Sequence, residues 1–364
     1  MISDSTVSSF SSQRPFVVAG PCSAESREQI LTTAAALQPL GIDCFRAGIW
    51  KPRTRPGLFE GIGSEALPWL VEVQQTLHLR VGTEVCTPQH VEEVLRCGLD
   101  MVWIGARTTS SPFAVSELAQ ALKGTNIEVL VKNPISPDAA LWCGAIGRLS
   151  SLGLRNLKAV FRGCTPLSPS ALFRNFPYWR VVDRLRSELP HIPILCDPSH
   201  ITGDRDRVMD LCLIAQELGM NGLMVECHPH PQEALSDAAQ QVTPRQLHDI
   251  LEVLRSNGTS AADGIAVGLA RYRALLSDID QALFELLLQR VDLTARIARY
   301  KGEHNLPALQ PEQYRIMTDK CTQMAQQEGL DSDFVLRLYE LLHRESVRQQ
   351  DQEIKYLRDQ QDKI

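Results

Sequence analysis

The stretch Ile192-Pro-Ile-Leu-Cys-Asp-Pro-Ser-His200 is a short apolar run that ends directly at two groups able to bind a metal ion, Asp197 and His200. Seven further runs in the first two thirds of the chain also end at or close to a polar group. The eight runs cover residues 16–20, 44–48, 79–85, 101–106, 128–131, 157–161, 192–196 and 222–225. Their spacing of roughly 30 residues, with amphipathic stretches between them, is typical of a strand–helix repeat with parallel strands. Eight such units predict an α/β fold of the closed (β/α)8 (TIM) barrel type.

The polar groups after these runs should share one rim of the barrel, because functional residues of this fold lie at the carboxyl ends of the strands. In chain order they are Cys22, Lys51, Glu84 with Cys86, Arg107, Lys132, Arg162, Asp197 with His200, and Glu226 with His228. Glu84 and Cys86 find no firm role, and we expect them to pack in the core or to support neighbouring site residues.

Length and composition bound the remaining possibilities. The chain has 364 residues, which exceeds one barrel of about 250 and leaves room for a second unit of about 100. The net charge of −6 argues against a nucleic-acid binder. No apolar stretch reaches the ~18 residues of a membrane span, and the first residues lack the apolar core of a signal peptide. Ten scattered cysteines without a CxxC pair fit reduced thiols, so a cytoplasmic protein is expected.

The chain divides by composition into four parts. Residues 1–14 form a serine-rich arm, 15–256 the barrel, 257–266 a linker within the run Ser256-Asn-Gly-Thr-Ser-Ala-Ala-Asp-Gly264, and 267–364 a second domain. From Leu269 onward apolar residues recur at three- and four-residue steps, which predicts one long amphipathic helix. Two more helices are expected over 311–328 and from 331 onward. Three helices offer only a small core, so we expect burial against a partner chain or the barrel.

One set of strand-end residues has the chemistry of a metal site. Cys22, His200, Glu226 and Asp237 supply one thiolate, one imidazole and two carboxylates from different places in the chain. Such mixed ligation suits Mn²⁺, Fe²⁺, Co²⁺ or Zn²⁺ better than Mg²⁺ or Ca²⁺. Each residue alone is more often structural, and only their convergence at strand ends favours one divalent ion.

A second set is cationic and predicts binding of more than one anionic group. It consists of Arg46, Lys51, Arg53, Arg107, Lys132 and Arg162. Arginine forks match phosphate and carboxylate with two hydrogen bonds, and a lysine adds a mobile charge and a proton donor. An isolated Arg or Lys is usually a solvated surface residue, but these follow apolar runs.

In combination these motifs resemble those of a known family. Seven motifs in order carry the resemblance: Gly20-Pro-Cys-Ser23, Arg46 before Lys51-Pro-Arg-Thr54, Ile104-Gly-Ala-Arg-Thr-Thr109, Val131-Lys-Asn-Pro134, Phe161-Arg-Gly163, Asp197-Pro-Ser-His200 and Val225-Glu-Cys-His228. Over about residues 15–255 the chain resembles type I, β-subgroup 3-deoxy-D-arabino-heptulosonate 7-phosphate (DAHP) synthase. That resemblance implies condensation of phosphoenolpyruvate with erythrose 4-phosphate.

The resemblance implies a role for each matched residue. The metal ligands would be Cys22, His200, Glu226 and Asp237, with Mn²⁺ preferred. Phosphoenolpyruvate would be held by Arg107, Lys132 and Arg162, with Arg46 and Lys51 alongside. Arg53 and Thr54 would bind the phosphate of the tetrose, and Lys51 would donate a proton to the developing alkoxide. The rival is 3-deoxy-manno-octulosonate 8-phosphate synthase, which has the same fold and donor, and the Lys-Pro-Arg-Thr motif favours the tetrose.

The helical part resembles AroQ-type chorismate mutase over about residues 265–355. Tyr272-Arg-Ala-Leu-Leu-Ser-Asp-Ile-Asp280, Gln289-Arg290 and Glu345-Ser-Val-Arg-Gln-Gln350 carry this resemblance. It implies a pocket shared between two chains, with Arg273 from the partner, Arg290 for a carboxylate, and Lys301 with Gln350 at the ether oxygen. Ser346 would lie on the same helix face as Gln350. A homodimer through this domain, or a homotetramer, is therefore expected.

The helical part also departs from the family pattern. Gln310, Gln313 and Tyr314 stand where an acidic residue and then Arg-Glu are usual, and Arg315 could substitute only if its helix shifted register. The alternatives are an active mutase, a weak domain that senses chorismate or prephenate for feedback inhibition, and a barrel of another specificity joined to a dimerisation module.

Overall fold

The computed structural model describes residues 14–51, 57, 59–166, 172–256 and 263–361. Their contacts divide the chain into two compact units, Met1–Leu275 and Leu276–Ile364. Each unit is described by itself. The division falls inside one long helix, and the domain boundaries expected from composition remain predictions.

The first unit is a closed barrel of eight parallel strands in the order β1 to β8, with β8 paired to β1. This confirms the predicted fold. The strands are β1 (Phe16–Gly20), β2 (Cys44–Arg46), β3 (Val81–Val85), β4 (Met101–Ile104), β5 (Glu128–Lys132), β6 (Leu157–Phe161), β7 (Ile194–Cys196) and β8 (Gly222–Glu226). Several are a few residues shorter than the apolar runs that predicted them.

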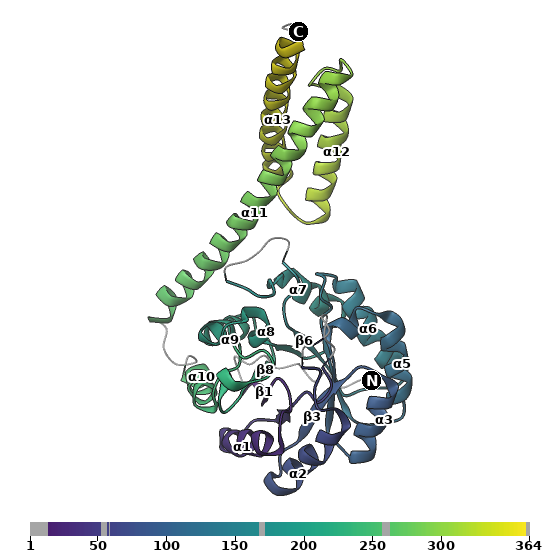
Figure 1. The fold of residues 1–364 in the computed structure, drawn as a ribbon, viewed down its shortest axis with the longest axis vertical. Coiled ribbons are helices and arrows are strands. Elements are labelled where there is room, and N and C mark those ends of the chain that lie inside the picture. The colour runs from purple at the N-terminus through teal and green to yellow at the C-terminus, as the bar shows by residue number, and fades with distance from the viewer. Residues whose placement is uncertain (1–13, 52–56, 58, 167–171, 257–262, 362–364) are drawn as a thin grey trace. The chain divides into compact units, whose positions relative to one another are not determined.

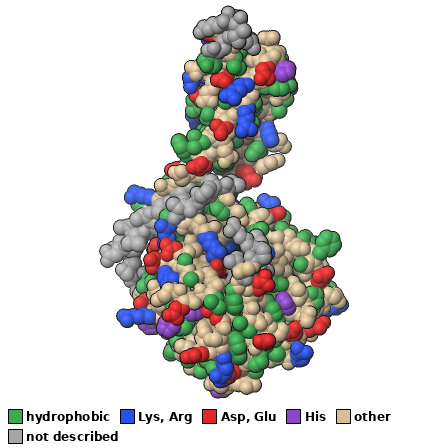
Figure 2. Space-filling view, in the orientation of Figure 1, with side chains coloured by type: hydrophobic (Ala, Val, Ile, Leu, Met, Phe, Trp, Pro, Cys, Tyr) green, Lys and Arg blue, Asp and Glu red, His purple; other side chains and the backbone are tan. Residues whose placement is uncertain are grey.

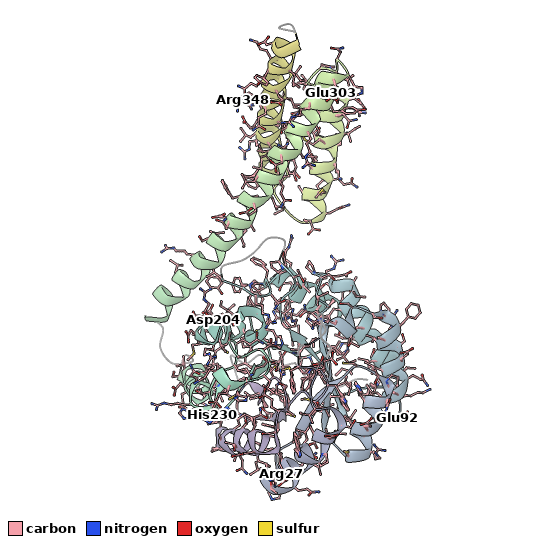
Figure 3. All side chains as sticks on the ribbon, viewed as in Figure 1. Arg27, Glu92, Asp204, His230, Glu303 and Arg348 are labelled. Atoms are coloured by element: carbon pink, nitrogen blue, oxygen red, sulfur yellow. The ribbon has the colours of Figure 1, made fainter. Side chains whose placement is uncertain are left out.

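Helices surround the strands (Figure 1). They are α1 (Arg27–Leu37), α2 (Leu67–Leu77), α3 (Pro88–Cys97), α4 (Ala106–Thr109), α5 (Pro112–Leu122), α6 (Ala139–Ser151), α7 (Trp179–Glu188), α8 (Pro198–Thr202), α9 (Val208–Glu217) and α10 (Pro244–Ser256). Ser26, Thr87 and Asp138 begin three of them with a side-chain oxygen that accepts from a backbone N–H of the first turn. Charged side chains such as Arg27 and Glu92 lie on the outer helices (Figure 3).

Alternation along the strands divides the barrel core into two layers. Val17 and Ala19 of β1 join the large cluster that includes residues of the surrounding helices, whereas Val18 joins a smaller cluster. The smaller cluster is Val18, Cys44, Met101, Trp103, Leu130, Val160, Leu195 and Met224, drawn from seven of the eight strands. Because successive side chains of a strand face opposite sides, this cluster fills the barrel interior.

The second unit contains helices only, as predicted, within its described residues. Its helices are α11 (Asp263–Glu303), whose residues up to Leu275 belong to the first unit, α12 (Pro311–Gln327) and α13 (Ser332–Gln361). Helix α11 begins at Asp263, inside the stretch expected to be a linker. The buried apolar cluster of this unit is small, consisting of Cys321, Ala325 and Val335.

No helix among the described residues is both long enough and apolar enough to span a membrane. On the face drawn in Figure 2, side chains of both charge signs are interspersed.

Candidate active sites

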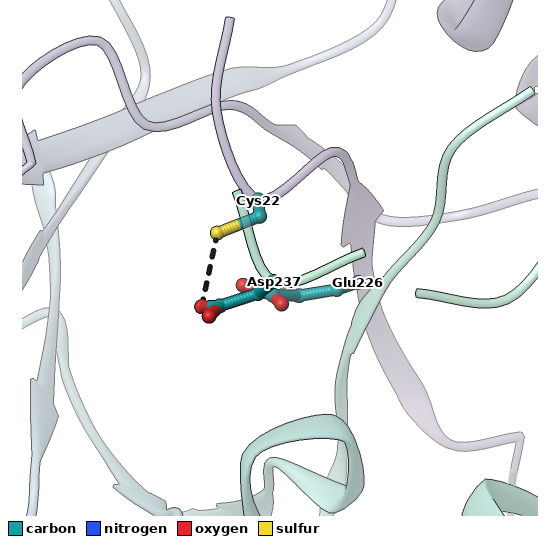
Figure 4. Close-up of side chains that lie close together, drawn as sticks. All are labelled: Cys22, Glu226 and Asp237. Carbon is teal, nitrogen blue, oxygen red and sulfur yellow. Dashed lines mark hydrogen bonds between the residues drawn. The ribbon is translucent and has the colours of Figure 1, made fainter. Parts of the chain in front are cut away.

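The four predicted metal ligands converge at the carboxyl ends of β1, β7 and β8. Ligand atoms of Cys22, Glu226 and Asp237 all lie within 4.8 Å of one another (Figure 4). The Nε2 atom of His200 lies 3.8 Å from Glu226 Oε1 and 4.0 Å from Asp237 Oδ2. Cys22 lies two residues after β1 and His200 four residues after β7, Glu226 is the last residue of β8, and Asp237 comes from the segment after β8. One thiol, one imidazole and two carboxylates therefore face a common point.

Asp197 fixes the orientation of His200. The His200 Nδ1 atom lies 2.8 Å from Asp197 Oδ2, which favours a proton on Nδ1 and leaves the Nε2 lone pair toward the other donors. Lys132 donates to the same Asp197 oxygen at 2.8 Å. Although burial alone would raise it, the charges of His200 and Lys132 hold the pKa of Asp197 well below its ordinary value. The carboxylate of Asp197 therefore stays ionised between His200, a predicted metal ligand, and Lys132, a predicted substrate-binding residue.

Glu226 is held from two sides. Arg46 Nη2 donates to Glu226 Oε1 at 3.0 Å, and Gln240 Nε2 donates to Oε2 at 2.7 Å. Burial would raise the pKa of Glu226, but His200 and then Arg46 outweigh it and lower that pKa. Burial, reinforced by Glu226, raises the pKa of the Cys22 thiol to about 12. Without a bound cation the thiol is thus protonated.

The predicted cations line a cavity of about 360 Å³ beside these donors. Lys51, Arg107, Lys132 and Arg162 face it together with His200 and Asp237. Helix α4 begins directly after β4 and carries Arg107, whereas Lys132 is the last residue of β5 and Arg162 follows β6. With Arg174, five cationic side chains line this polar cavity beside the predicted metal ligands, and such a cavity can bind a multiply charged anion.

Lys51 links the two sets of residues. Its Nζ atom donates to the Cys22 carbonyl oxygen at 2.9 Å and lies 3.2 Å from Cys22 Sγ. Burial would lower the pKa of Lys51, but Cys22 and then Glu84 outweigh it and raise that pKa. The ammonium is therefore a charged proton donor at the edge of the metal site.

Arg46 does not line the cavity. It is buried with its guanidinium 4.8 Å from the centre of the Trp103 ring, and its Nε and Nη1 atoms are buried without a hydrogen-bond partner. Arg53 and Thr54 lie outside the described residues, so their predicted contact with the tetrose remains a prediction. Glu84 lines the cavity and accepts a hydrogen bond from Trp103 Nε1 at 3.1 Å. This contact fits the supporting part expected of Glu84.

Two cavity residues, Arg174 and Asn175, were missed by the sequence analysis. Arg174 Nη1 donates to Oδ1 of Asp237, a predicted metal ligand, at 3.0 Å. Asn175 Oδ1 accepts a hydrogen bond from Arg162 Nη1 at 2.6 Å. Both residues lie between β6 and α7 and follow no apolar run. No pattern in a single sequence marks them as site residues.

A second cavity, of about 420 Å³, lies within the helical unit. Arg290 of α11 donates to the Leu342 carbonyl oxygen at 2.9 Å and to the Ser346 hydroxyl. Lys301 donates to Gln350 Oε1 at 2.9 Å. All four predicted pocket residues, Arg290, Lys301, Ser346 and Gln350, line this cavity. The pairing places two cations of α11 against polar side chains of α13.

The residues that depart from the family pattern line the same cavity. Gln310, Gln313 and Tyr314 line it, and no carboxylate is among the described lining residues. Arg315 is exposed and pairs with Glu312, so the register shift that would bring it inward has not occurred. Arg273 is likewise not one of the lining residues.

The fold and the first site define a class of enzyme: a (β/α)8 barrel with an anion-binding cavity beside a mixed thiol, imidazole and carboxylate donor set. Residues 2–262 match the DAHP synthetase I family, and the chain belongs to that family. Residues 272–351 match chorismate mutase type II. The chain is accordingly a bifunctional shikimate-pathway enzyme that combines these two domains.

Individual relatives support both matches. The chain is 31% identical over 239 residues to a phospho-2-dehydro-3-deoxyheptonate aldolase of Thermotoga maritima, covering 66% of this chain and 68% of that protein. A crystal structure of DAHP synthase from the same organism superposes with a TM-score of 0.61 at 30% identity, covering 70% of each chain. A Streptomyces venezuelae 4-amino-4-deoxychorismate mutase is 37% identical over 83 residues, which are 23% of this chain and 81% of that protein.

The rival specificity is also represented among the relatives. A 2-dehydro-3-deoxyphosphooctonate aldolase of Bradyrhizobium is 27% identical over 287 residues, covering 72% of this chain and 92% of that protein.

Proposed function

We propose that the barrel condenses phosphoenolpyruvate with erythrose 4-phosphate to DAHP and phosphate, using one divalent metal ion held by Cys22, His200, Glu226 and Asp237. The observation that carries this proposal is the cluster of Cys22, Glu226 and Asp237, with His200 Nε2 within 4.0 Å of both carboxylates, beside the cavity lined by Lys51, Arg107, Lys132 and Arg162. The donor set fits such an ion because it offers a thiol, an imidazole with a free Nε2 and two carboxylates within a few ångströms. When bound, the ion would supply Lewis acidity toward the aldehyde oxygen.

The side chains of the cavity would bind the substrate and transfer a proton. Arg107, Lys132 and Arg162 hold the phosphate and carboxylate of phosphoenolpyruvate, and Arg46 supports Glu226. Attack by C3 of the enol on the aldehyde carbon forms the new C–C bond and leaves an alkoxide. Lys51 donates a proton to that oxygen. Water then adds at C2, and the phosphate leaves with the bridging oxygen.

The test removes and restores the metal in the full-length chain. After EDTA treatment DAHP formation should be lost, and Mn²⁺, Fe²⁺, Co²⁺ or Zn²⁺ added singly should restore it, with Mn²⁺ preferred. Lys51→Ala should abolish turnover while the metal content stays unchanged. Retained turnover in that variant would contradict the role of Lys51.

The sugar phosphate is tested in parallel assays with erythrose 4-phosphate and arabinose 5-phosphate. The Lys51-Pro-Arg-Thr54 motif supports the four-carbon sugar. Preference for the five-carbon sugar would instead place the barrel with the phosphooctonate aldolases.

For the helical domain the proposed reaction is rearrangement of chorismate to prephenate. Arg290 would bind a carboxylate, and Lys301 with Gln350 would stabilise the developing charge on the ether oxygen. Prephenate formation by the full-length chain tests this function. Two alternatives remain: a ligand with an amino group on the ring, supported by the S. venezuelae relative, and a catalytically weak sensor, supported by the absence of a carboxylate among the described lining residues.

Dimerisation is proposed through the helical domain, with a homotetramer as the larger alternative. Large apolar side chains at three- and four-residue steps along α11 are exposed in the single chain, including Leu276 at 59%, Ile279 at 48% and Leu283 at 51%. A contiguous apolar helix face of this kind indicates a protein interface. A partner chain would also supply Arg273 to the pocket. We further propose a cytoplasmic location, in keeping with the reduced thiols.

A further inference from the structure

The helical cavity contains a polar atom that no role above accounts for. His343 of α13 lines the cavity, and its Nε2 atom is buried without a hydrogen-bond partner. A buried nitrogen without a partner destabilises a fold, so such atoms are rare outside sites that bind something. The imidazole is held by stacking on Tyr314, with ring centroids 4.7 Å apart and planes inclined by 22°.

Three polar residues that line the cavity with His343 already have hydrogen-bond partners. Arg290 donates to Ser346, Lys301 donates to Gln350, and the Tyr314 hydroxyl donates to Glu340 Oε1 at 3.4 Å. Within the described residues the Nε2 atom of His343 therefore keeps an unused hydrogen-bonding position in the wall of the cavity. Its ring rests against a tyrosine that stands at one of the positions departing from the family pattern.

The imidazole is uncharged at neutral pH. Burial first, and then the positive charges of Arg290 and Lys301, lower the pKa of His343. A neutral imidazole binds an anion less well than the two cations beside it. Its Nε2 atom either donates or accepts one hydrogen bond, depending on the tautomer. The best ligand group for it is an uncharged polar group, such as a hydroxyl, which can satisfy either tautomer.

We propose that His343 is a substrate-binding residue that recognises the ring hydroxyl of the mutase substrate. Chorismate carries two carboxylates, one ether oxygen and one ring hydroxyl. The proposed function, on which this inference rests, assigns carboxylate binding to arginines and the ether oxygen to Lys301 and Gln350. The hydroxyl is the remaining group, and His343 is a neutral group matched to it. His343 thereby sets preference at the ring position that carries an amino group in the substrate named for the S. venezuelae relative.

The test compares His343→Leu with His343→Gln in the full-length chain. Leucine keeps the volume and removes the hydrogen bond, whereas glutamine keeps a terminal amide at similar reach. KM for chorismate should rise roughly tenfold in His343→Leu and stay within about threefold in His343→Gln. His304→Leu is the matched control, because His304 is exposed and does not line the cavity; its KM should not change.

A merely structural role predicts a different result. Replacing an unpartnered buried nitrogen by an apolar group should then leave the melting temperature equal or higher and KM unchanged. An unchanged KM in His343→Leu overturns the inference while leaving mutase activity intact. An analogue of chorismate without the ring hydroxyl should bind wild type and His343→Leu equally; a persisting tenfold difference would also overturn it.

Failure of the proposed mutase function can be distinguished from failure of the inference about His343. If the wild-type chain does not convert chorismate, that function is wrong, and calorimetric titration with chorismate decides the inference. Weaker binding by His343→Leu than by wild type and His304→Leu supports the contact, whereas equal binding by all three contradicts it.

Discussion

At the residue scale, Asp197 is the side chain that connects the predicted metal ligands to the predicted substrate-binding cations. It contacts His200 Nδ1 on one side and Lys132 Nζ on the other, and it is fully buried. Its negative charge sets the tautomer of His200 and the direction of the lysine. We infer that Asp197 is a positioning residue, not a ligand.

Asp197→Asn should therefore weaken metal binding about 10- to 100-fold while the ligand set remains complete. The amide no longer carries the charge that favours the Nδ1–H form of His200. Metal titration of the EDTA-treated variant measures this effect, and excess metal should restore part of the DAHP synthase activity. Cys212→Ala is a suitable control, because this buried thiol belongs to α9 and to the apolar core. Metal affinity equal to wild type in Asp197→Asn would contradict the coupling role.

The alkaline limit of the mutase reaction should follow Lys301. Burial lowers the pKa of Lys301 below its ordinary value of 10.5. Because the charged ammonium is the form that stabilises the ether oxygen, activity should be complete below the lowered pKa and fall as pH rises through it. The pH–rate profile should thus bend below pH 10.5. Lys301→Arg, with a guanidinium that stays charged, should move the bend to higher pH even if turnover is slower. An unmoved bend would assign it to another group.

The limit of sequence reasoning at this scale is visible in particular residues. Lys51, Lys132 and Arg162 could be predicted because each follows an apolar run, and strand ends in a barrel share one rim. Arg174 and His343 could not. Arg174 reaches the site from a long connection, and His343 is one polar residue among many on an amphipathic helix, so only three-dimensional proximity identifies them.

At the element scale, the strands were predictable because a buried parallel strand is apolar on both faces. The first residues of the strands were harder to predict. β3 begins at Val81 and β7 at Ile194, each two residues later than the apolar run suggested. The start of α11 was also misplaced. Ser, Gly and Asn are typical of linkers, but the described helix already includes Asp263 and Gly264. Helix propensity is a weak guide at such boundaries.

The contact between β1 and β2 gives a prediction at this scale. Gly20 has φ 147°, and a Cβ atom there would lie 2.1 Å from the Arg46 carbonyl oxygen. Gly20→Ala must separate the two strand ends, displacing Cys22 and Arg46 together. We expect a loss of about 1–3 kcal/mol of unfolding free energy and at least tenfold lower DAHP synthase activity.

Gly98→Ala is the control for that substitution. Gly98 also has positive φ, 72°, but a Cβ atom there would meet nothing within 4 Å. It should lose about 1 kcal/mol from backbone strain alone and keep full activity. Urea unfolding and DAHP assays on both variants separate strain from steric displacement. Full activity in Gly20→Ala would show that the site tolerates movement of the strand ends.

At the scale of the whole molecule, the chain joins the enzyme that opens a pathway to one that consumes its later branch-point intermediate. The helical cavity is lined by two cations, Arg290 and Lys301, which suit an anionic ligand whether or not the domain converts that ligand quickly. Binding there could bias the barrel only if the ligand has different affinities for two states of the chain. Feedback inhibition by chorismate or prephenate is the hypothesis that the fusion supports.

That hypothesis predicts that chorismate or prephenate lowers the DAHP synthase rate of the full-length chain at least about fivefold, the lower end of common coupling strengths. Arg290→Ala should abolish this inhibition, because it removes a cation of the helical cavity. Arg299→Ala should retain it, since Arg299 is exposed on the same helix, pairs with Glu353 and does not line the cavity. Inhibition that persists in Arg290→Ala would place the inhibitor on the barrel itself, where the same cations that bind phosphoenolpyruvate could accept its carboxylates. DAHP synthase kinetics that are identical with and without both ligands would refute feedback inhibition. The two domains of the chain would then act independently of each other.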